Sequence, residues 1–308
     1  MTGIMRKRAS VSGRVHDAKA MLPKPAHVIV VSSDEGAFGK ATTALHIVVG
    51  LMQKGQRVAT IDLDRDSNNL THHLENRRTW AARVGAALPM PTHYRPVARC
   101  DGGSCDDEEV ADFAAFAGAI ATVEHAHDFV LIATPRIDND LTRLAYSLAD
   151  TVVTPLADSF VDIGVLSAID PVSFAVTGVS PYAMTVREAR RQRRLLDGRL
   201  SDWVVLCDRP TSINSRNRHR VAEQLGWLAV QLGFRLADGI CEPVVYRELL
   251  PRGLTAFDDL NEIVLGVPAG PPHLAAQYEV RNLIESLRLP LDERRRRRAD
   301  THAQWAAA

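Results

Sequence analysis

Short apolar runs and longer helical patterns alternate along most of the chain. The runs are rich in β-branched residues and lack polar alternation, which is typical of strands buried on both faces. Five runs stand out: HVIVVS at 27–32, RVATID at 57–62, DFVLIA at 128–133, TVVTP at 151–155 and DWVVLC at 202–207. Since helical patterns of ten or more residues separate them, we predict an α/β fold with a mostly parallel sheet covered by helices on both faces.

The alternation extends over one stretch, which predicts a single domain from residue 26 to residue 290. Residues 1–25 contain Gly, Ser, Lys and Pro without periodicity and are expected to form a flexible tail. Residues 291–308 include a run of arginines and are expected to form a charged tail. Within the domain, 89–109 is rich in Pro, Gly, Asp and Cys, which predicts a surface insertion.

Charge and composition narrow the classes of partner. The 308 residues include 37 Lys and Arg and 37 Asp and Glu, so the whole chain offers no net attraction to phosphate. Affinity for nucleic acid therefore requires a local basic patch. The sequence has no signal-peptide pattern and no apolar run long enough for a membrane helix, and its four cysteines follow no ligand pattern. We expect a cytoplasmic protein without membrane contact or a metal centre.

The first predicted strand leads into a glycine-containing loop that ends in a lysine. Gly36, Gly39 and Lys40 lie between this strand and an amphipathic helix, which is the context of a phosphate-binding loop. Glycines let backbone N–H groups converge on an anion, the helix N-terminus adds partial positive charge, and the lysine reaches the terminal phosphates. Taken alone, the loop is equally compatible with an ordinary strand-to-helix turn, because the motif is broken.

Two contacts to Mg²⁺ are missing from the motif. The complete loop reads G-x-x-x-x-G-K-[ST], whereas here the first glycine is absent and Ala41 replaces the hydroxyl that normally binds the metal. The run DFVLIA ends in Ala133, where a carboxylate normally holds the water shell of the metal. We therefore expect no bound Mg²⁺ and, because the metal neutralises developing charge, the loss of hydrolysis.

Several segments along the chain form a specific series: DEGAFGKAT, TIDLDRD, HLENRRTW, FVLIATP, ADSFVDIGVLSAIDPV, REARRQRRLLDG, DWVVLCDRP, SRNRHR and VVYRELLPRGLT. Together they resemble successive landmarks of the MipZ family, division-plane-positioning ATPases of the ParA/MinD group, over about residues 27–290. The middle and C-terminal segments are peculiar to that family. The resemblance implies a P-loop NTPase-like fold and an ATP-switched protein that dimerises around two nucleotides, binds DNA without sequence preference, interacts with ParB and inhibits FtsZ polymerisation.

The resemblance implies a nucleotide site whose core is retained. Its expected nucleotide-binding residues are Gly36, Gly39, Lys40, Thr42 and Asp62. Asp64 matches the switch region of the family, where a carboxylate orients an attacking water, and is the candidate catalytic residue. We expect Asp64 to be insufficient without the metal contacts, and ATP or ADP to bind weakly and independently of Mg²⁺.

The departures from the family gather where its chemistry lies. The degenerate positions are Glu35, Ala37, Ala41 and Ala133. Glu35 stands where the family carries a signature lysine that reaches the partner's phosphates, so the charge is reversed. In a face-to-face dimer this carboxylate would approach the phosphates, which predicts a monomer, or a heterodimer with an intact paralogue. Because drift is not expected to alter so many nucleotide-contacting positions and spare the core, the sequence indicates a pseudo-ATPase.

A helical pattern in the second half of the chain carries a cluster of arginines. They are Arg187, Arg190, Arg191 and Arg194. Their i, i+3, i+4 and i+7 spacing predicts one basic helix face. Such a face is often simply solvated, but the family carries a DNA-binding patch in this region, and Arg216 and Arg218 add a second cluster. We therefore expect sequence-independent DNA binding through these arginines.

These observations favour one function and leave two alternatives. The favoured function is a MipZ-like regulator of division-site placement or chromosome positioning that has lost hydrolysis. It acts through DNA, a ParB-like centromere-binding protein and an FtsZ-like division protein, in the cytoplasm or on the nucleoid. The second is a slow ATPase switch that dimerises with ATP and inhibits FtsZ assembly, against which Ala41 and Ala133 argue. The third is an iron-protein-type P-loop enzyme, for which the chain lacks cysteines placed to bridge a cluster.

Overall fold

The computed structural model describes residues 25–33, 37–65, 67, 69–96, 105–136, 138–156, 163–170, 176–207, 215–240, 244–294 and 296, without the side chains of 37–38, 105–109 and 215–220. The strands are β1 (His27–Val31), β2 (Val58–Asp62), β3 (Thr92–Tyr94), β4 (Phe129–Ala133), β5 (Thr151–Leu156), β6 (Ser167–Ile169), β7 (Val176–Val179), β8 (Asp202–Cys207) and β9 (Arg235–Asp238). The helices are α2 (Ala37–Gln53), α3 (Asn69–Val84), α4 (Cys105–Val123), α5 (Asp140–Leu148), α7 (Pro181–Asp197), α8 (Ser215–Leu232), α9 (Val244–Leu249), η1 (Leu250–Arg252), α10 (Glu262–Leu265) and α11 (Pro271–Ser286).

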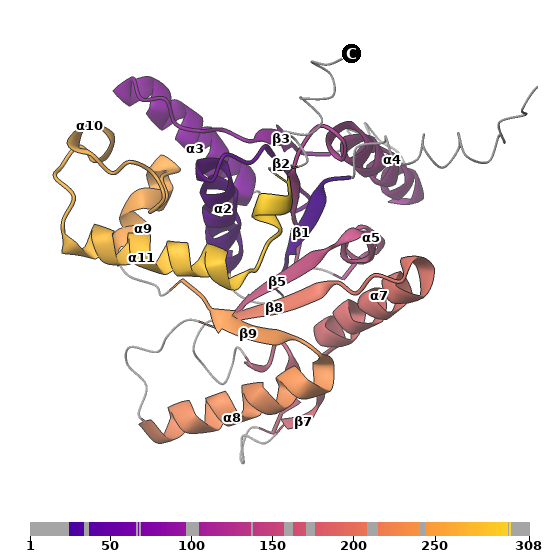
Figure 1. The fold of residues 1–308 in the computed structure, drawn as a ribbon. Coiled ribbons are helices and arrows are strands. Elements are labelled where there is room, and N and C mark those ends of the chain that lie inside the picture. The colour runs from indigo at the N-terminus through magenta and orange to yellow at the C-terminus, as the bar shows by residue number, and fades with distance from the viewer. Residues whose placement is uncertain are drawn as a thin grey trace, which may run out of the picture.

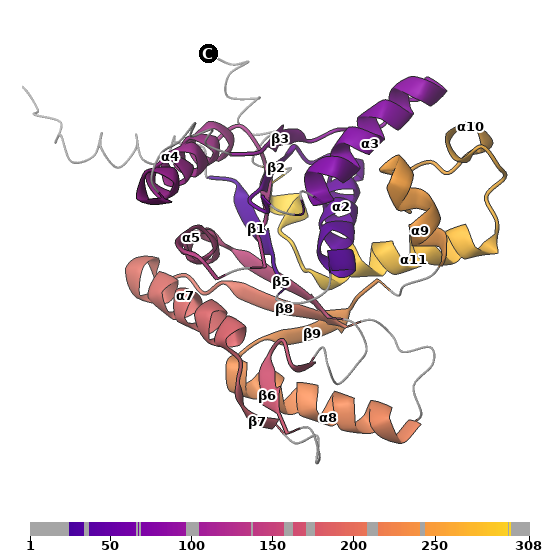
Figure 2. The same cartoon turned by 180° about the vertical axis from the view of Figure 1, so that it is seen from behind.

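In the described part of the chain, seven strands form one parallel sheet in the order β3-β2-β4-β1-β5-β8-β9 (Figure 1). Strands β6 and β7 form a separate antiparallel pair, which lies beside α8 in both views (Figure 2). The five apolar runs coincide with β1, β2, β4, β5 and β8. The predicted α/β fold with a mostly parallel sheet is therefore confirmed.

The two faces of the sheet bury alternate residues of the same strands. Ile29 and Val31 of β1 belong to one core, which also contains residues of α2, α3, α9 and α11. Val30 belongs to the other core, with residues of α4, α5, α7 and α8. Figure 2 shows these two groups of helices on opposite sides of the sheet. Because both faces are covered, both alternating sets of positions in these strands are mainly apolar, which explains the missing polar alternation.

The register of the central strands places three loops side by side. Val31, the last residue of β1, pairs with Ala133, the last residue of β4. Ala133 pairs in turn with Asp62, the last residue of β2. Since parallel strands end at the same edge, the loops after these strands meet at the carboxyl edge of the sheet. Ligands bind at this edge in open α/β sheets.

The segment 89–109, predicted to be a surface insertion, is in part an element of the sheet. Thr92–Tyr94 forms β3, which pairs with β2 at the edge, and α4 begins at Cys105. The prediction is wrong here because β3 is short and its residues are only partly buried, so no apolar run marks it. The ring of His93 is instead held by hydrogen bonds to the hydroxyls of Thr60 (2.9 Å) and Thr71 (3.1 Å).

The start of the predicted charged tail lies against the domain. Leu291 packs against the core, and its carbonyl accepts a hydrogen bond from the side chain of Gln56 at 3.3 Å. Arg294 donates to the carbonyl of Pro25 at 2.7 Å. The domain therefore includes residues beyond 290, whereas the predicted N-terminal tail up to residue 24 and residues 297–308 lie outside the described part.

Buried polar contacts join α3 to the C-terminal part of the domain. Arg77 is fully buried and forms a bidentate ion pair with Asp258, with N–O distances of 2.8 and 2.5 Å. It also donates to the carbonyls of Pro89 and Gly253. Gly253 has a φ of 64°, and a Cβ there would collide with the backbone of Arg77. Only glycine lets η1 and α3 approach in this way.

Candidate functional site

Lys40 connects the loops that follow β2 and β4. It lies in the first turn of α2 and is only 5% exposed. Its ammonium group lies 3.2 Å from Oδ2 of Asp64 and donates a hydrogen bond to the carbonyl of Thr134. Burial lowers the pKa of Lys40, and the charge of Asp64 opposes this shift. The lysine predicted to reach phosphates is thus paired within its own chain.

A short turn fixes Asp64. Ser67 donates its backbone N–H to Oδ1 at 3.2 Å and its hydroxyl to Oδ2 at 2.5 Å. Burial raises the pKa of the Asp64 carboxyl, but the Ser67 hydrogen bonds and the charge of Lys40 outweigh it and hold the pKa below its ordinary value. Asp64 is therefore ionised at neutral pH. Sequence reasoning missed Ser67, although an Asp followed three residues later by Ser is typical of a side-chain-capped turn.

Asp62 organises the start of α3. Its Oδ2 accepts hydrogen bonds from the backbone N–H (3.0 Å) and the hydroxyl (2.7 Å) of Thr71, and its Oδ1 accepts from the backbone N–H of Asp64 (3.2 Å). A carboxylate in this place satisfies an N–H at a helix start and complements the helix dipole. Its predicted contact with nucleotide stays a prediction beside this structural role. Nothing in the local sequence indicates Thr71 or His93, because their contacts are tertiary.

The two positions that carry metal ligands in a complete phosphate site hold methyl groups. Ala41 follows Lys40 in α2 and Ala133 ends β4, with exposures of 4% and 2%. Mg²⁺ is bound through oxygen ligands, and neither side chain has one. Among the described residues there is also no cluster of three or more His, Cys, Asp or Glu that could hold a metal. The residues present at this site therefore do not fit Mg²⁺.

The other predicted nucleotide-binding positions flank Lys40. Gly39 is exposed, and a Cβ there would make only an ordinary contact of 3.6 Å with Pro155, so packing within the chain does not require glycine. Thr42 is buried, and its carbonyl hydrogen-bonds Nδ1 of His46 at 2.8 Å. The predicted roles of Glu35, Gly36 and the Ala37 side chain fall outside the described part of the chain and stay predictions.

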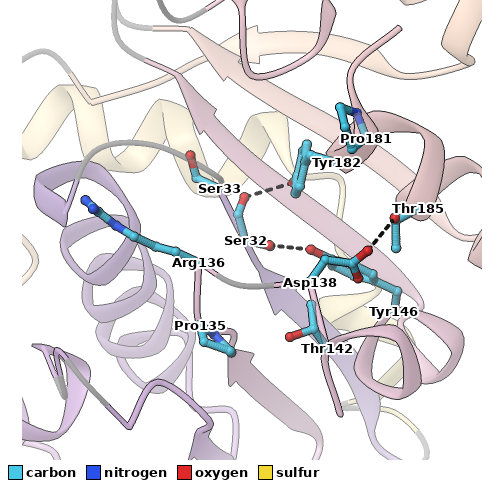
Figure 3. A pocket seen from close by; sticks show the side chains of 10 residues that line it. All are labelled: Ser32, Ser33, Pro135, Arg136, Asp138, Thr142, Tyr146, Pro181, Tyr182 and Thr185. Carbon is cyan, nitrogen blue, oxygen red and sulfur yellow. Dashed lines mark hydrogen bonds between the residues drawn. The ribbon is translucent and has the colours of Figure 1, made fainter. Parts of the chain in front are cut away.

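A pocket of about 110 Å³ opens beside this site, between the ends of β1 and β4 and the helices α5 and α7 (Figure 3). Its walls include Ser32, Ser33, Arg136, Asp138, Tyr146 and Tyr182. The hydroxyls of Ser32 and Tyr146 lie 2.5 Å apart, and Tyr182 donates to the carbonyl of Ser32 at 3.1 Å. Burial raises the pKa of Tyr146 well above its ordinary value, so this phenol is neutral. The pocket has both polar and apolar walls, and it includes Ser32 and Ser33, the residues that follow β1.

Helix α7 presents three of the four predicted arginines to solvent. Arg187, Arg191 and Arg194 are exposed and follow i, i+4 and i+7 spacing, so they share a helix face. Arg191 forms an ion pair with Glu188, with N–O distances of 2.9 and 3.0 Å. This carboxylate reduces the net charge of the face.

Arg190 does not belong to the exposed face, and the prediction is wrong for this residue. It is 7% exposed, donates to the carbonyls of Ser201 (3.0 Å) and Leu232 (3.3 Å), and lies over the ring of Trp203. Spacing alone does not reveal which edge of a wide arginine stripe faces the core. Arg216 and Arg218 lie at the start of α8, and their side chains are outside the described part.

The chain matches a known protein family over most of its length. A family model described as ATPase MipZ matches residues 27–291. The chromosome-partitioning ATPase Soj of Thermus thermophilus is 23% identical over 227 residues, which cover 71% of this chain and 86% of that protein. Separately, none of the described helices has both the length and the apolar character that crossing a bilayer requires.

Two solved structures share the fold at low sequence identity. Apo McdA from Cyanothece has a TM-score of 0.53 and 16% identity, covering 83% of this chain and 98% of that one. An ATP complex of a McdA variant from Cyanothece has a TM-score of 0.51 and 18% identity, covering 82% of this chain and 97% of that one. At these identities the likeness shows the fold alone.

Proposed function

Because the chain belongs to the MipZ family of ATPases, within the ParA/MinD group, we propose that it regulates division-site placement or chromosome positioning without hydrolysing ATP. The observation that carries this proposal is the pair of buried alanines, Ala41 and Ala133, at both metal-ligand positions. The fold around them is retained, as expected for a protein that keeps its binding surfaces after losing its chemistry.

The loss of hydrolysis follows from charge. Phosphoryl transfer depends on positioning and on neutralising the charge of the phosphate oxygens, and in P-loop proteins a metal ion supplies much of that neutralisation. Ala41 and Ala133 supply no ligand for such an ion. Asp64, the remaining carboxylate candidate, accepts hydrogen bonds from Lys40 and Ser67, which compete with an attacking water for its oxygens.

Residual nucleotide binding is proposed to be weak and biased toward ADP. Lys40 is retained at the start of α2, and backbone N–H groups at a helix N-terminus favour an anion. Glu35, by the family match, would bring a negative charge toward a γ-phosphate or toward the phosphates of a second copy. We therefore propose a monomer, or a heterodimer with an intact paralogue, in place of a homodimer formed with ATP.

The proposed partners are DNA of any sequence, a ParB-like centromere-binding protein and an FtsZ-like division protein. The exposed arginines Arg187, Arg191 and Arg194 support the first of these, because guanidinium groups on one helix face bind phosphates. The two protein partners rest on the family alone. With these partners the protein would act in the cytoplasm and on the nucleoid.

A second candidate is a slow ATPase switch of the MipZ/ParA type. The observation that favours it is the buried Lys40–Asp64 ion pair, which keeps both the phosphate-loop lysine and the switch carboxylate in contact. In this case ATP would drive dimerisation, and the dimer would inhibit FtsZ assembly.

Steady-state phosphate release by the full chain with ATP and Mg²⁺ tests the proposal, with Lys40→Ala as the matched control. We expect the two proteins to release phosphate at the same background rate. Sedimentation with and without ATP is expected to give the same mass. Release that increases with protein concentration and disappears in Lys40→Ala, together with dimerisation on adding ATP, would establish the slow switch instead.

A further inference from the structure

Arg136 lies beside the residues that follow β1. It follows β4, whose last residue pairs with the last residue of β1. With Ser32 and Ser33, which lead from β1 into the loop, it lines the pocket of Figure 3. The figure also shows its side chain extending away from Tyr146 and Tyr182. The guanidinium group thus lies on the side of the pocket away from α5 and α7.

Lys40 lies at the same end of β4 as Arg136. The ammonium group of Lys40 donates to the carbonyl of Thr134, two residues before Arg136. Burial is the main cause of the lowered pKa of Lys40, and the positive charge of Arg136 contributes to it. Two neighbouring cations repel each other, and an anion bound between them relieves that repulsion.

The carboxylates near Arg136 are engaged by other groups. Asp138, on the wall of the same pocket, accepts hydrogen bonds from Arg143 at 2.9 Å and from Thr185 at 3.2 Å. Asp64 is engaged by Lys40. Within the described ranges, Arg136 forms no ion pair. Its exposed guanidinium is therefore accessible to an anion that enters from solvent.

We propose that Arg136 replaces the divalent cation of the phosphate site, so that its guanidinium and the Lys40 ammonium together bind a diphosphate group without Mg²⁺. Ala41 and Ala133 leave both metal-ligand positions without an oxygen ligand for Mg²⁺, and this supports the replacement of the metal ion by Arg136. A guanidinium is permanently charged and offers a planar fork of N–H donors that matches two phosphate oxygens. The inference deepens the proposed function and rests on its residual binding of ADP.

Calorimetric titration of the full chain with ADP tests the inference, once in EDTA and once in Mg²⁺. We expect equal affinity in both conditions for the natural chain. Arg136→Ala should weaken binding about tenfold or more, as expected for the loss of a charge-assisted contact. Arg136→Lys should lie in between, because it keeps the charge and loses the fork. Arg281→Ala, which removes an exposed arginine of α11, is the matched control and should bind ADP as the natural chain does.

Each other outcome overturns the inference in a distinguishable way. Equal affinity of Arg136→Ala and the natural chain in EDTA would remove Arg136 from the site and leave the loss of hydrolysis untouched. If the natural chain does not bind ADP at millimolar concentration, the inference also fails, and the proposed loss of hydrolysis is unaffected. Binding that requires Mg²⁺ would overturn both the inference and the proposed metal-free site. Thermal unfolding of each Arg136 variant shows whether the substitution leaves the fold intact. Competition of inorganic pyrophosphate with ADP shows whether the diphosphate group is the part that is bound.

Discussion

Lys40 and Asp64 form an ion pair with a distance of 3.2 Å, 24 residues apart in the sequence and both buried. The lysine that would bind a phosphate therefore has a competing anion in its own chain. Binding of a phosphate requires Lys40 to leave Asp64 or to share its N–H groups between the two anions. This competition makes the strength of the pair a determinant of phosphate affinity.

Asp64→Asn is expected to strengthen pyrophosphate binding several-fold, up to about tenfold, because it removes the competing negative charge and keeps the side-chain volume. Calorimetric titration with pyrophosphate measures the change. Ser67→Ala is the control, since it loosens the Asp64 carboxylate without altering charge and should have a smaller effect. An unchanged or weaker affinity in Asp64→Asn would mean that Asp64 positions Lys40 for the ligand.

Restoring both metal ligands should restore a response to Mg²⁺. In the double variant Ala41→Thr with Ala133→Asp, we expect Mg²⁺ to strengthen ADP binding about tenfold, because an oxygen ligand is present at each position. Both sites are buried, so the larger side chains should also cost about 1–3 kcal/mol of unfolding free energy. Ala41→Val with Ala133→Leu, which adds similar volume but no oxygen ligand at either position, is the control. The idea fails if both variants respond to Mg²⁺ equally or not at all.

The buried Arg77–Asp258 pair should be a major determinant of stability. Asp258→Asn and Arg77→Met each leave one side of the pair uncompensated, and we expect a loss of about 3–5 kcal/mol in urea unfolding for removal of one partner. The exposed pair of Arg143 and Asp138 is the comparison, and Arg143→Ala should cause a much smaller loss because solvent screens this pair. Similar small losses in both places would show that α3 is held to the C-terminal part by apolar contacts alone.

Stability should fall in mild acid because of His46. Burial is the main cause that lowers the pKa of His46 from 6.5 to about 4, and its Nε2 faces the backbone N–H of Ala256 at 3.4 Å. Between pH 6.5 and 4, His46 therefore becomes protonated in the unfolded chain but stays neutral in the folded chain. The unfolding free energy should decrease over this window, by up to about 3 kcal/mol from this residue.

Urea unfolding of the natural chain and of His46→Gln at pH 7, 6 and 5 checks this expectation. The variant should lose stability at pH 7 and show a shallower dependence on pH. His72→Gln, at an exposed site, should keep the full dependence. Parallel pH curves for the natural chain and His46→Gln would assign the dependence to other groups, among them His27, whose pKa burial also lowers to about 4.

The arginines of α7 should separate into binding and structural residues. Arg187→Ala and Arg194→Ala should each weaken binding to unrelated duplexes uniformly and reduce the slope of log affinity against log salt by about one. Glu188→Gln should strengthen binding, because it frees Arg191 from its ion pair. Arg190→Ala should instead lower the melting temperature. Fluorescence anisotropy at several salt concentrations measures DNA binding by the Arg187, Arg194 and Glu188 variants. If the natural chain does not bind DNA at low salt, the arginine face is only solvated.

The sequence by itself determined the fold class and the chemical content of the site. Apolar runs such as HVIVVS are typical of a strand covered on both faces, and helical patterns between such runs favour a parallel sheet. The absence of metal-binding oxygen at Ala41 and Ala133 is equally a property of the residue types. Neither conclusion depends on which other residues lie nearby.

Only the tertiary structure decided which of these groups are paired. Arg190 and Arg191 are adjacent in the sequence, yet one lies on Trp203 and the other meets solvent, because the packing of α7 against β8 sets the rotation of the helix. The Arg77–Asp258 contact spans 181 positions, and β3 gains its hydrogen bonds from β2 and not from a pattern of its own. Local sequence carries no information about such contacts, since burial and charge pairing depend on residues that the fold brings together.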